Sequence, residues 1–166
     1  MPNYTNLSNQ VFGPDDEVTD VYTYQKFPMG TYREEDGKGY RFGQFDNGTG
    51  NLTAAANLLV YHFADTGTFV FTTDVSDSDR NKVRGVLVSV PADQGYMWIQ
   101  TKGPATVATN GDDDIAEGDA VIASAAGDGT ADSTAQDTAP TNRVVGWALA
   151  ADSDGANTVL VDLVLD

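Results

Sequence analysis

The residues of this 166-residue chain that could carry out chemistry are a single histidine, His62, and a large excess of carboxylates. A Ser-His-Asp triad needs an activated serine beside the imidazole, but the chain has no G-x-S-x-G nucleophile elbow. If residues 58–63 form a strand, His62 shares a face with Leu58 and Val60, which indicates a structural histidine near a strand end. Cysteine is absent, so thiol catalysis, disulfides and cysteine-ligated zinc are excluded.

The carboxylates are densest between residues 112 and 119. Glycosidases need two carboxylates on opposite sides of a cleft, whereas this cluster follows an Asn-Gly turn and is typical of a solvated hairpin tip. Aspartate-rich loops also suit calcium, but the EF-hand pattern fails at Asp77 and Asp152, because an apolar residue stands in the twelfth place. The pattern favours a charged, solubilising surface, with a structural cation as the alternative. We therefore expect no catalytic residue, no cofactor and no dedicated metal site.

The charge of the chain is strongly negative and unevenly distributed. It has 9 basic and 25 acidic residues, a net charge of −16, which disfavours binding to nucleic acid or to a membrane surface. Residues 1–85 hold 12 acidic and 7 basic residues, whereas residues 86–166 hold 13 acidic and only 2 basic residues. In the first half Arg80, Lys82 and Arg84 are two residues apart, so on a strand they would point to one face. Such a stripe is either a contact for an acidic partner or a charged strand edge that prevents stray pairing.

The elements that must position these residues are mostly strands. Turn signals such as Asp36-Gly37 separate β-rich runs, because Asp, Asn and Gly accept positive φ. Residues 53–63 fit either a helix or a loop followed by a strand from 58 to 63, and residues 127–142 are typical of a long surface loop. The sequence therefore predicts an all-β fold, a small β-barrel or sandwich domain with an extended N-terminal arm. The strands are expected at 68–73, 82–90, 96–100, 119–126, 144–151 and 158–165.

Three regions are expected along the chain. Residues 1–28 contain Pro2, Pro14 and Pro28 and no apolar periodicity, so they read as an extended arm that gains its order from a neighbouring molecule. Residues 29–90 form a β-rich part, and residues 91–166 a small barrel. The N-terminus lacks the pattern of a secretory signal, and no apolar stretch approaches the roughly 20 residues of a membrane-spanning helix.

Four segments of the second half form an ordered pattern. They read GYMWIQTKGPA (95–105), IAEGDAV (115–121), VVGWALA (144–150) and VLVDLVL (159–165). In this order they resemble the small β-barrel domain of tailed-bacteriophage capsid decoration proteins, also called cement proteins. The run MGTYREEDGKGYRF (29–42) resembles the region that precedes that barrel in phage virion proteins. Gly118, Asp119 and Gly146 are the most specific positions of the resemblance.

The resemblance implies a non-enzymatic structural role in a virion. Such proteins bind the major capsid protein on the outer surface of the capsid, often as homotrimers, and bridge neighbouring subunits to stabilise the shell. No catalytic residue or cofactor is implied. The alternative is a receptor- or carbohydrate-binding β-domain of a phage or cell surface, for which aromatic platforms and Asp-rich loops would serve.

The residues themselves add three expectations about packing. Gly118-Asp119 reads as a turn that enters a strand, with Asp119 bonded to nearby backbone N–H groups. Gly146 within an apolar strand indicates a bend or the close approach of another backbone. Trp98 and Trp147 are expected in the core or in a subunit interface, since tryptophan buries a large area.

The first half, which holds seven of the nine basic residues, is the expected face toward an acidic shell, and the acidic loops 112–117 and 128–137 are expected in solvent. Aromatic residues would supply affinity, while the basic residues would set association rate and salt dependence. The predicted capsid-contact residues are Tyr22, Tyr24, Phe27, Arg80, Lys82 and Arg84.

Overall fold

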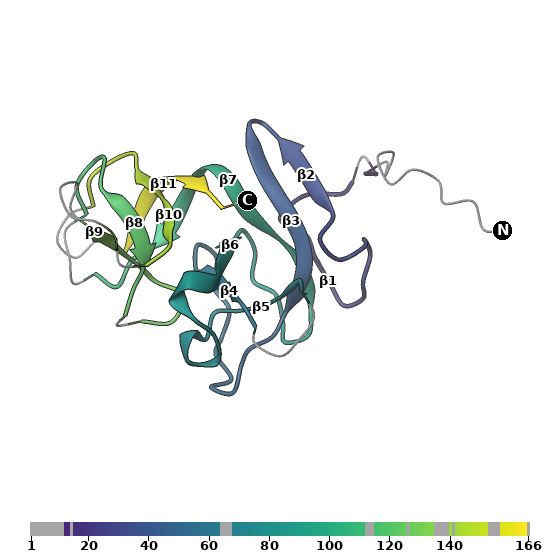
Figure 1. Cartoon of the computed structure of the whole chain (residues 1–166). Helices are drawn as coiled ribbons and strands as arrows, with labels where there is room; N and C mark the ends of the chain where they lie inside the picture. The colour runs from purple at the N-terminus through teal and green to yellow at the C-terminus, as the bar shows by residue number, and fades with distance from the viewer. Residues whose placement is uncertain are drawn as a thin grey trace.

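The strands form one continuous mixed sheet in the computed structural model (Figure 1). The structure describes residues 12–13, 15–63, 68–111, 115–125, 127–134, 140, 142–152 and 157–165. The prediction of an all-β fold is confirmed. Its organising element is β7 (Tyr96–Ala108), with 13 residues the longest strand of the described chain. Its four partners are β1 (Val21–Tyr22), β3 (Lys38–Phe45), β6 (Val83–Leu87) and β11 (Thr158–Val164).

The first half of β7 belongs to a closed circuit of five strands, which we call the first barrel. β3 pairs in parallel with β5 (Val70–Thr72), which pairs with β4 (Leu59–His62); β4 pairs with β6, and both β6 and β3 pair with β7. Every strand of the circuit therefore has two neighbours and leaves no open edge there. The apolar side chains inside are Phe45, Ala54, Val60, Phe71, Leu87, Met97 and Ile99.

The second half of β7 belongs to another circuit, the second barrel. It runs from β7 through β11 to β10 (Val144–Ala148), β8 (Ala120–Ala123) and β9 (Ala131–Thr134). A single bridge between Thr109, directly after β7, and Ala131 of β9 closes it. Alternate residues of β11 point inward, as the buried Val159, Val161 and Leu163 show.

The two barrels pack against each other through β4. Val60 points into the first barrel, while its neighbours Leu59 and Tyr61 are fully buried in the cluster that includes Val107 and Val161 of the second barrel. Because successive residues of a strand face opposite sides, one short strand serves both cores. In Figure 1 β8 to β11 lie at the left and β3 at the right, with β4 and β5 below and between them.

Between its two halves, β7 contains an irregularity held by a side chain. The β3–β7 register shifts between Gly39 and Tyr40, which lie opposite Lys102 and Gln100. The buried Gln100 side chain donates from Nε2 to the carbonyls of Lys102, Gly103 and Pro104, at 3.1, 3.3 and 2.9 Å. It thus satisfies backbone oxygens at the point where the strand passes from one barrel to the other.

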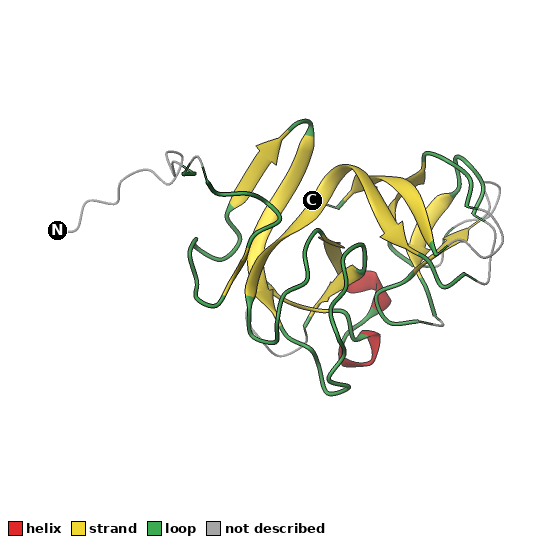
Figure 2. Cartoon of the chain, turned by 180° about the vertical axis from the view of Figure 1, so that it is seen from behind, coloured by secondary structure: helices red, strands yellow, loops and turns green. Residues whose placement is uncertain are grey.

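The other elements of the described residues are a hairpin and two short helical turns (Figure 2). β2 (Tyr32–Glu35) pairs with β3 across the predicted Asp36-Gly37 turn, whose residues have φ of 50° and 76°. The 3-10 helices are η2 (Val75–Asp77) and η3 (Arg80–Lys82), and an aspartate side chain, Asp74 or Asp79, caps each N-terminus. No helix within the described ranges is both long and apolar enough to cross a membrane.

Three local expectations are settled by the structure. Residues 59–62 form a strand, so the helical alternative for 53–63 is wrong. The expected long loop is wrong at 131–134, which is β9; the small Ala131 is fully buried there. The expected strand from Lys82 begins only at Val83, because the Asp79 cap turns residues 80–82 into a 3-10 helix.

Gly146 of β10 confirms the expected close approach of another backbone. A Cβ built on Gly146 would lie 2.1 Å from the carbonyl oxygen of Asp162 in β11. The β8–β10 register also shifts between Val144 and Gly146. The second barrel therefore accepts no side chain at this position.

We predict that Gly146→Ala lowers the free energy of unfolding by about 3 kcal/mol, because a backbone atom cannot move aside as a side chain can. The control is Gly37→Ala, where a Cβ meets nothing within 4 Å and only the positive φ is penalised, by about 1 kcal/mol. Urea unfolding of both variants provides the measurement. Equal losses would contradict the close contact.

Candidate functional site

The six predicted contact residues lie on two separate parts of the structure. Tyr22, Tyr24 and Phe27 lie on the segment before β2, which runs along the outside of β3 and β7. The basic residues lie at η3 and β6. The structure therefore does not bring the aromatic and basic residues together into one patch.

The aromatic residues differ in how far they are available to a partner. Phe27 is only 8% exposed, and its ring centroid lies 5.2 Å from that of Phe42 and 5.3 Å from that of Trp98. Tyr22 is half-buried, whereas Tyr24 is 62% exposed. We call the group to which Phe27 belongs the N-terminal aromatic cluster. It comprises Phe12, Tyr22, Phe27, Tyr40, Phe42, Tyr96 and Trp98.

Polar contacts also hold this segment on its own chain. Lys26 donates to Asp16, and this hydrogen bond lowers the pKa of the Asp16 carboxyl and raises the pKa of Lys26. The Lys26 ammonium lies 4.8 Å from the ring centroid of Tyr22. Arg33 donates to the Asp16 carbonyl at 2.7 Å while its guanidinium lies over Phe12. The described part of the expected arm, from Phe12 onward, thus packs on the sheet it precedes; residues 1–11 and Pro14 lie outside the described residues.

The basic residues do not form the expected stripe on one strand face. Arg80 and Lys82 belong to η3, and only Arg84 lies in β6. The predicted stripe required all three residues to lie on one strand, so this prediction is wrong. The Asp79 carboxylate accepts a hydrogen bond from the Asn81 N–H at 2.8 Å, which stabilises the turn. Arg84 is exposed and lines a pocket that neither Arg80 nor Lys82 reaches.

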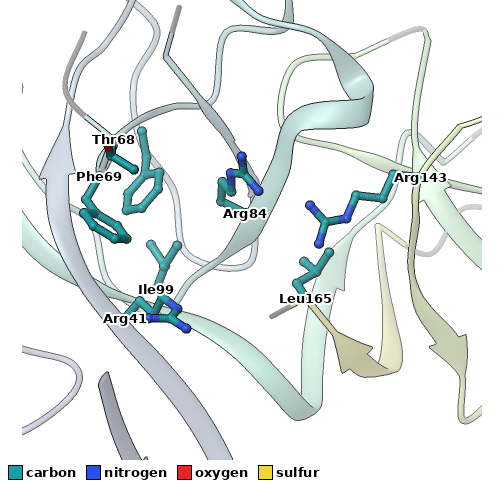
Figure 3. Close-up of a pocket in the computed structure, with 8 residues that line it drawn as sticks. Arg41, Thr68, Phe69, Arg84, Ile99, Arg143 and Leu165 are labelled. Carbon is teal, nitrogen blue, oxygen red and sulfur yellow. The ribbon is translucent and has the colours of Figure 1, made fainter. Parts of the chain in front are cut away.

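That pocket, of about 320 Å³, opens where the two barrels meet (Figure 3). Arg41 of β3 lies opposite Ile99 of β7, so both side chains are on one face of the sheet. The second barrel contributes Arg143, just before β10, and Leu165, just after β11. We call it the arginine pocket; its lining residues are Arg41, Thr68, Phe69, Phe71, Arg84, Ile99, Arg143 and Leu165.

Sequence reasoning missed Arg143, because it stands in the acidic half and outside any motif. The structure ties it to the first barrel: its N–H donates to Asn81 Oδ1 at 2.8 Å, and its guanidinium donates to the Val83 carbonyl at 3.2 Å. Burial away from water, and then the positive charge of Arg84, lower the pKa of Arg143. These contacts hold Arg143, a residue of the second half of the sequence, beside η3 and β6 of the first half.

A second surface candidate is the outer face of β10 and β11. Trp147 lies opposite Asp162, and the Leu149 N–H donates to the Leu160 carbonyl at 2.8 Å. We call this the outer apolar face; its large members are Trp147, Leu149, Leu160 and Val164, which are 48%, 42%, 42% and 46% exposed. Trp147 is therefore available to a subunit interface, whereas Trp98 is fully buried in the core. The signal in the sequence is VLVDLVL, a strand that is apolar on both faces.

The carboxylates mainly serve the local backbone. Asp119 confirms the expected turn: its side chain accepts from the Ala116 N–H at 3.0 Å, beside Gly118 with φ of 87°. Asp77 accepts from Thr49, and Asp74 from Ser76 and Gly50. Within the described ranges no three His, Asp or Glu side chains converge to hold a metal ion. Asp112 to Asp114 and parts of the 128–137 loop lie outside the described residues.

Comparison with known proteins gives one solved structure of interest. No family model matches the chain, and no curated protein matches it. The head fiber gp8.5 N base of bacteriophage phi29 is similar to 75% of this chain over 92% of its own length, with 18% sequence identity and a TM-score of 0.46. Similarity at this level assigns neither a fold family nor a function.

We predict that Phe27→Ala lowers the free energy of unfolding by about 3 to 4 kcal/mol, because a buried ring leaves a cavity beside Trp98. Tyr24→Ala should change it by less than about 0.5 kcal/mol, since that ring is mostly in solvent. Chemical denaturation followed by tryptophan fluorescence, to which Trp98 and Trp147 both contribute, compares the two. If Phe27→Ala left the free energy of unfolding unchanged, the N-terminal segment would not dock on its own chain.

Proposed function

We propose that the chain is a non-enzymatic structural protein of a tailed-phage virion, which binds the outer surface of the capsid and bridges neighbouring subunits. One observation carries the proposal. The four segments that resemble decoration proteins become β7, β8, β10 and β11, and the sheet places them side by side in the order β7-β11-β10-β8. A resemblance scattered over 71 residues of sequence (95–165) thus coincides with one compact set of neighbouring strands.

The major capsid protein is the proposed partner, and the cationic part of the chain is the face proposed to meet it. Arg80, Lys82 and Arg84 lie on neighbouring residues of η3 and β6, and the chain's net charge of −16 leaves few other places where an acidic shell could be approached. Tyr24 is the aromatic residue of the N-terminal segment with most of its surface available for such a contact. Phe27 would act indirectly, by holding that segment in place.

A homotrimer is the proposed assembly, with the outer apolar face as its interface. Exposed apolar patches of this kind mark contact sites in soluble proteins. Among the described outward-facing residues of β7, β10 and β11, the charged ones are Lys102, opposite Val164, and Asp162, opposite Trp147, and their charges offset one another. Copies of a strongly acidic chain repel one another least through such a face. Closed cyclic symmetry then limits the size of the assembly.

We predict that the chain co-sediments with expanded shells of the phage that encodes it. Replacing Arg80, Lys82 and Arg84 together with Ser should weaken this binding about tenfold or more at low salt, and less at 1 M salt, where the Debye length is about 3 Å. The matched variant replaces Asp112, Asp113 and Asp114 with Ser and should bind almost as the wild type does. Detachment of the aspartate variant alone would overturn the proposed orientation, and no co-sedimentation of the wild type would overturn the function.

We predict a trimer at micromolar concentration, measured as three times the chain mass by light scattering. Trp147→Ser combined with Leu160→Ser should give a folded monomer, because both side chains lie on the outer apolar face and neither fills the core. The control pair is Val21→Ser with Val90→Ser, which are equally exposed but lie elsewhere. A wild-type monomer, or a control pair that dissociates as readily, would contradict this interface.

A further inference from the structure

The arginine pocket concentrates positive charge on an acidic chain. Three of the five arginines line it, and none of the described residues of its lining is acidic. The ion pairs of the described residues use other cations: Lys26 pairs with Asp16, and Arg33 with Glu35. None of the three pocket arginines has an acidic partner within the described ranges.

Within the described residues, few of the hydrogen-bond donors of these guanidinium groups have a partner. A guanidinium has five N–H donors. Arg143 donates to the Val83 carbonyl, and Arg41 reaches the Gly30 carbonyl only at 3.4 Å. Figure 3 shows the three side chains entering from separate elements around the same hollow. Like charges held together in this way repel, and a bound anion would reverse that repulsion into attraction.

The apolar part of the lining restricts what that anion can be. Phe71 and Ile99 belong to the core of the first barrel and form an apolar wall, to which Phe69 and Leu165 add. The fork of an arginine matches the two oxygens of a carboxylate. The pocket therefore suits an oxyanion that is attached to an apolar body.

A polyanion fits less well than a single carboxylate. The remainder of the chain is even more acidic than −16 once these three arginines are set apart, so a phosphate backbone that left the pocket would meet repulsion within a Debye length of about 8 Å. A volume of about 320 Å³ is at the lower end for small-ligand sites, a size that admits a few side chains. An acidic peptide segment meets both limits.

We propose that the arginine pocket receives an acidic segment of the partner protein, a Glu or Asp carboxylate next to an apolar side chain. The carboxylate lies among Arg41, Arg84 and Arg143, and the apolar neighbour packs on Phe69 and Leu165. This identification of the partner's chemistry rests on the proposed attachment to a capsid. It adds to that function a defined socket contributed by both barrels, in place of a diffuse basic patch.

The socket is tested first on the full chain without any capsid. The probe is the capped tripeptide acetyl-Phe-Glu-Leu-amide, and its controls are the same peptide with Gln in place of Glu, inorganic phosphate and a single-stranded DNA oligonucleotide. In NMR titrations the Glu peptide should shift the Ile99 and Leu165 methyl resonances and bind at least about tenfold more tightly than the Gln peptide. Equal binding of both peptides, or tighter binding of phosphate or DNA, would overturn the proposal.

Charge-matched variants separate the socket from general electrostatics. Arg84→Ser with Arg143→Ser should lose at least about tenfold in affinity for the Glu peptide, whereas Arg80→Ser with Lys82→Ser removes the same charge outside the pocket and should lose less than about threefold. Arg84→Ser alone, at an exposed position, keeps the test valid if loss of the Arg143 contacts impairs folding. Asp166→Asn, which removes the acid next to Leu165 in the sequence, should preserve or tighten binding. Equal losses in the two double variants would contradict the socket.

Capsid co-sedimentation of the same variants distinguishes the two proposals. If wild-type chain binds shells and only the Arg84/Arg143 variant detaches, both proposals stand. If wild-type chain binds shells and the Arg84/Arg143 variant binds as well as the Arg80/Lys82 variant, the socket is wrong and the attachment function remains. If wild-type chain binds the Glu peptide but no shell, the capsid function fails and with it the identity of the partner, while the carboxylate chemistry of the pocket remains.

Discussion

Backbone hydrogen bonding along β7 is the constraint on which the rest of the structure depends. A strand that belongs to two barrels must change neighbours midway, and at that point the register of its pairing with β3 shifts. The amide of Gln100 satisfies the carbonyls of residues 102 to 104 there, while Gly103 adopts a φ of 79°. Because β7 pairs with strands of both barrels, neither core needs a separate edge strand at this point.

Both candidate surfaces follow from that sharing. Because the barrels meet at β7, side chains from β3, β6 and the two flanks of the second barrel converge on one hollow, which is the arginine pocket. On the far side, β11 uses its inward residues for the core and leaves Leu160 and Val164 outside. The N-terminal segment covers the third exposed side, over Phe42 and Trp98. Each surface thus results from the way in which the strands pair to form the two barrels.

The sequence alone predicts those features that depend on a residue and its neighbours along the chain. The Asp36-Gly37 turn, the Asp119 turn and the tight approach at Gly146 follow from the conformational limits of single residues. β3 was not expected, since Gly39 and Gly43 weaken its strand pattern, yet both glycines allow side chains of other strands to pack closely. β9 was hidden by its small polar composition, and it exists because β8 and the bridge at Thr109 pair with it. The bridge joins residues far apart in the sequence, and no local pattern contains such a contact.

The distribution of charge also depends on contacts between residues that are far apart in the sequence. Divided by sequence, seven of the nine basic residues lie in the first half, and Arg143 belongs to the second, more acidic half. Divided in space, Arg143 joins Arg41 and Arg84, because bonds to Asn81 and Val83 hold it against the first barrel. Three of the basic residues then lie between the barrels, whereas Lys102 and Asp162 offset each other among the described residues of the outer apolar face. A protein of net charge −16 can therefore carry two contact surfaces of different character, one that selects by charge and one that excludes water. The fold, rather than the composition, decides which of its residues a partner meets.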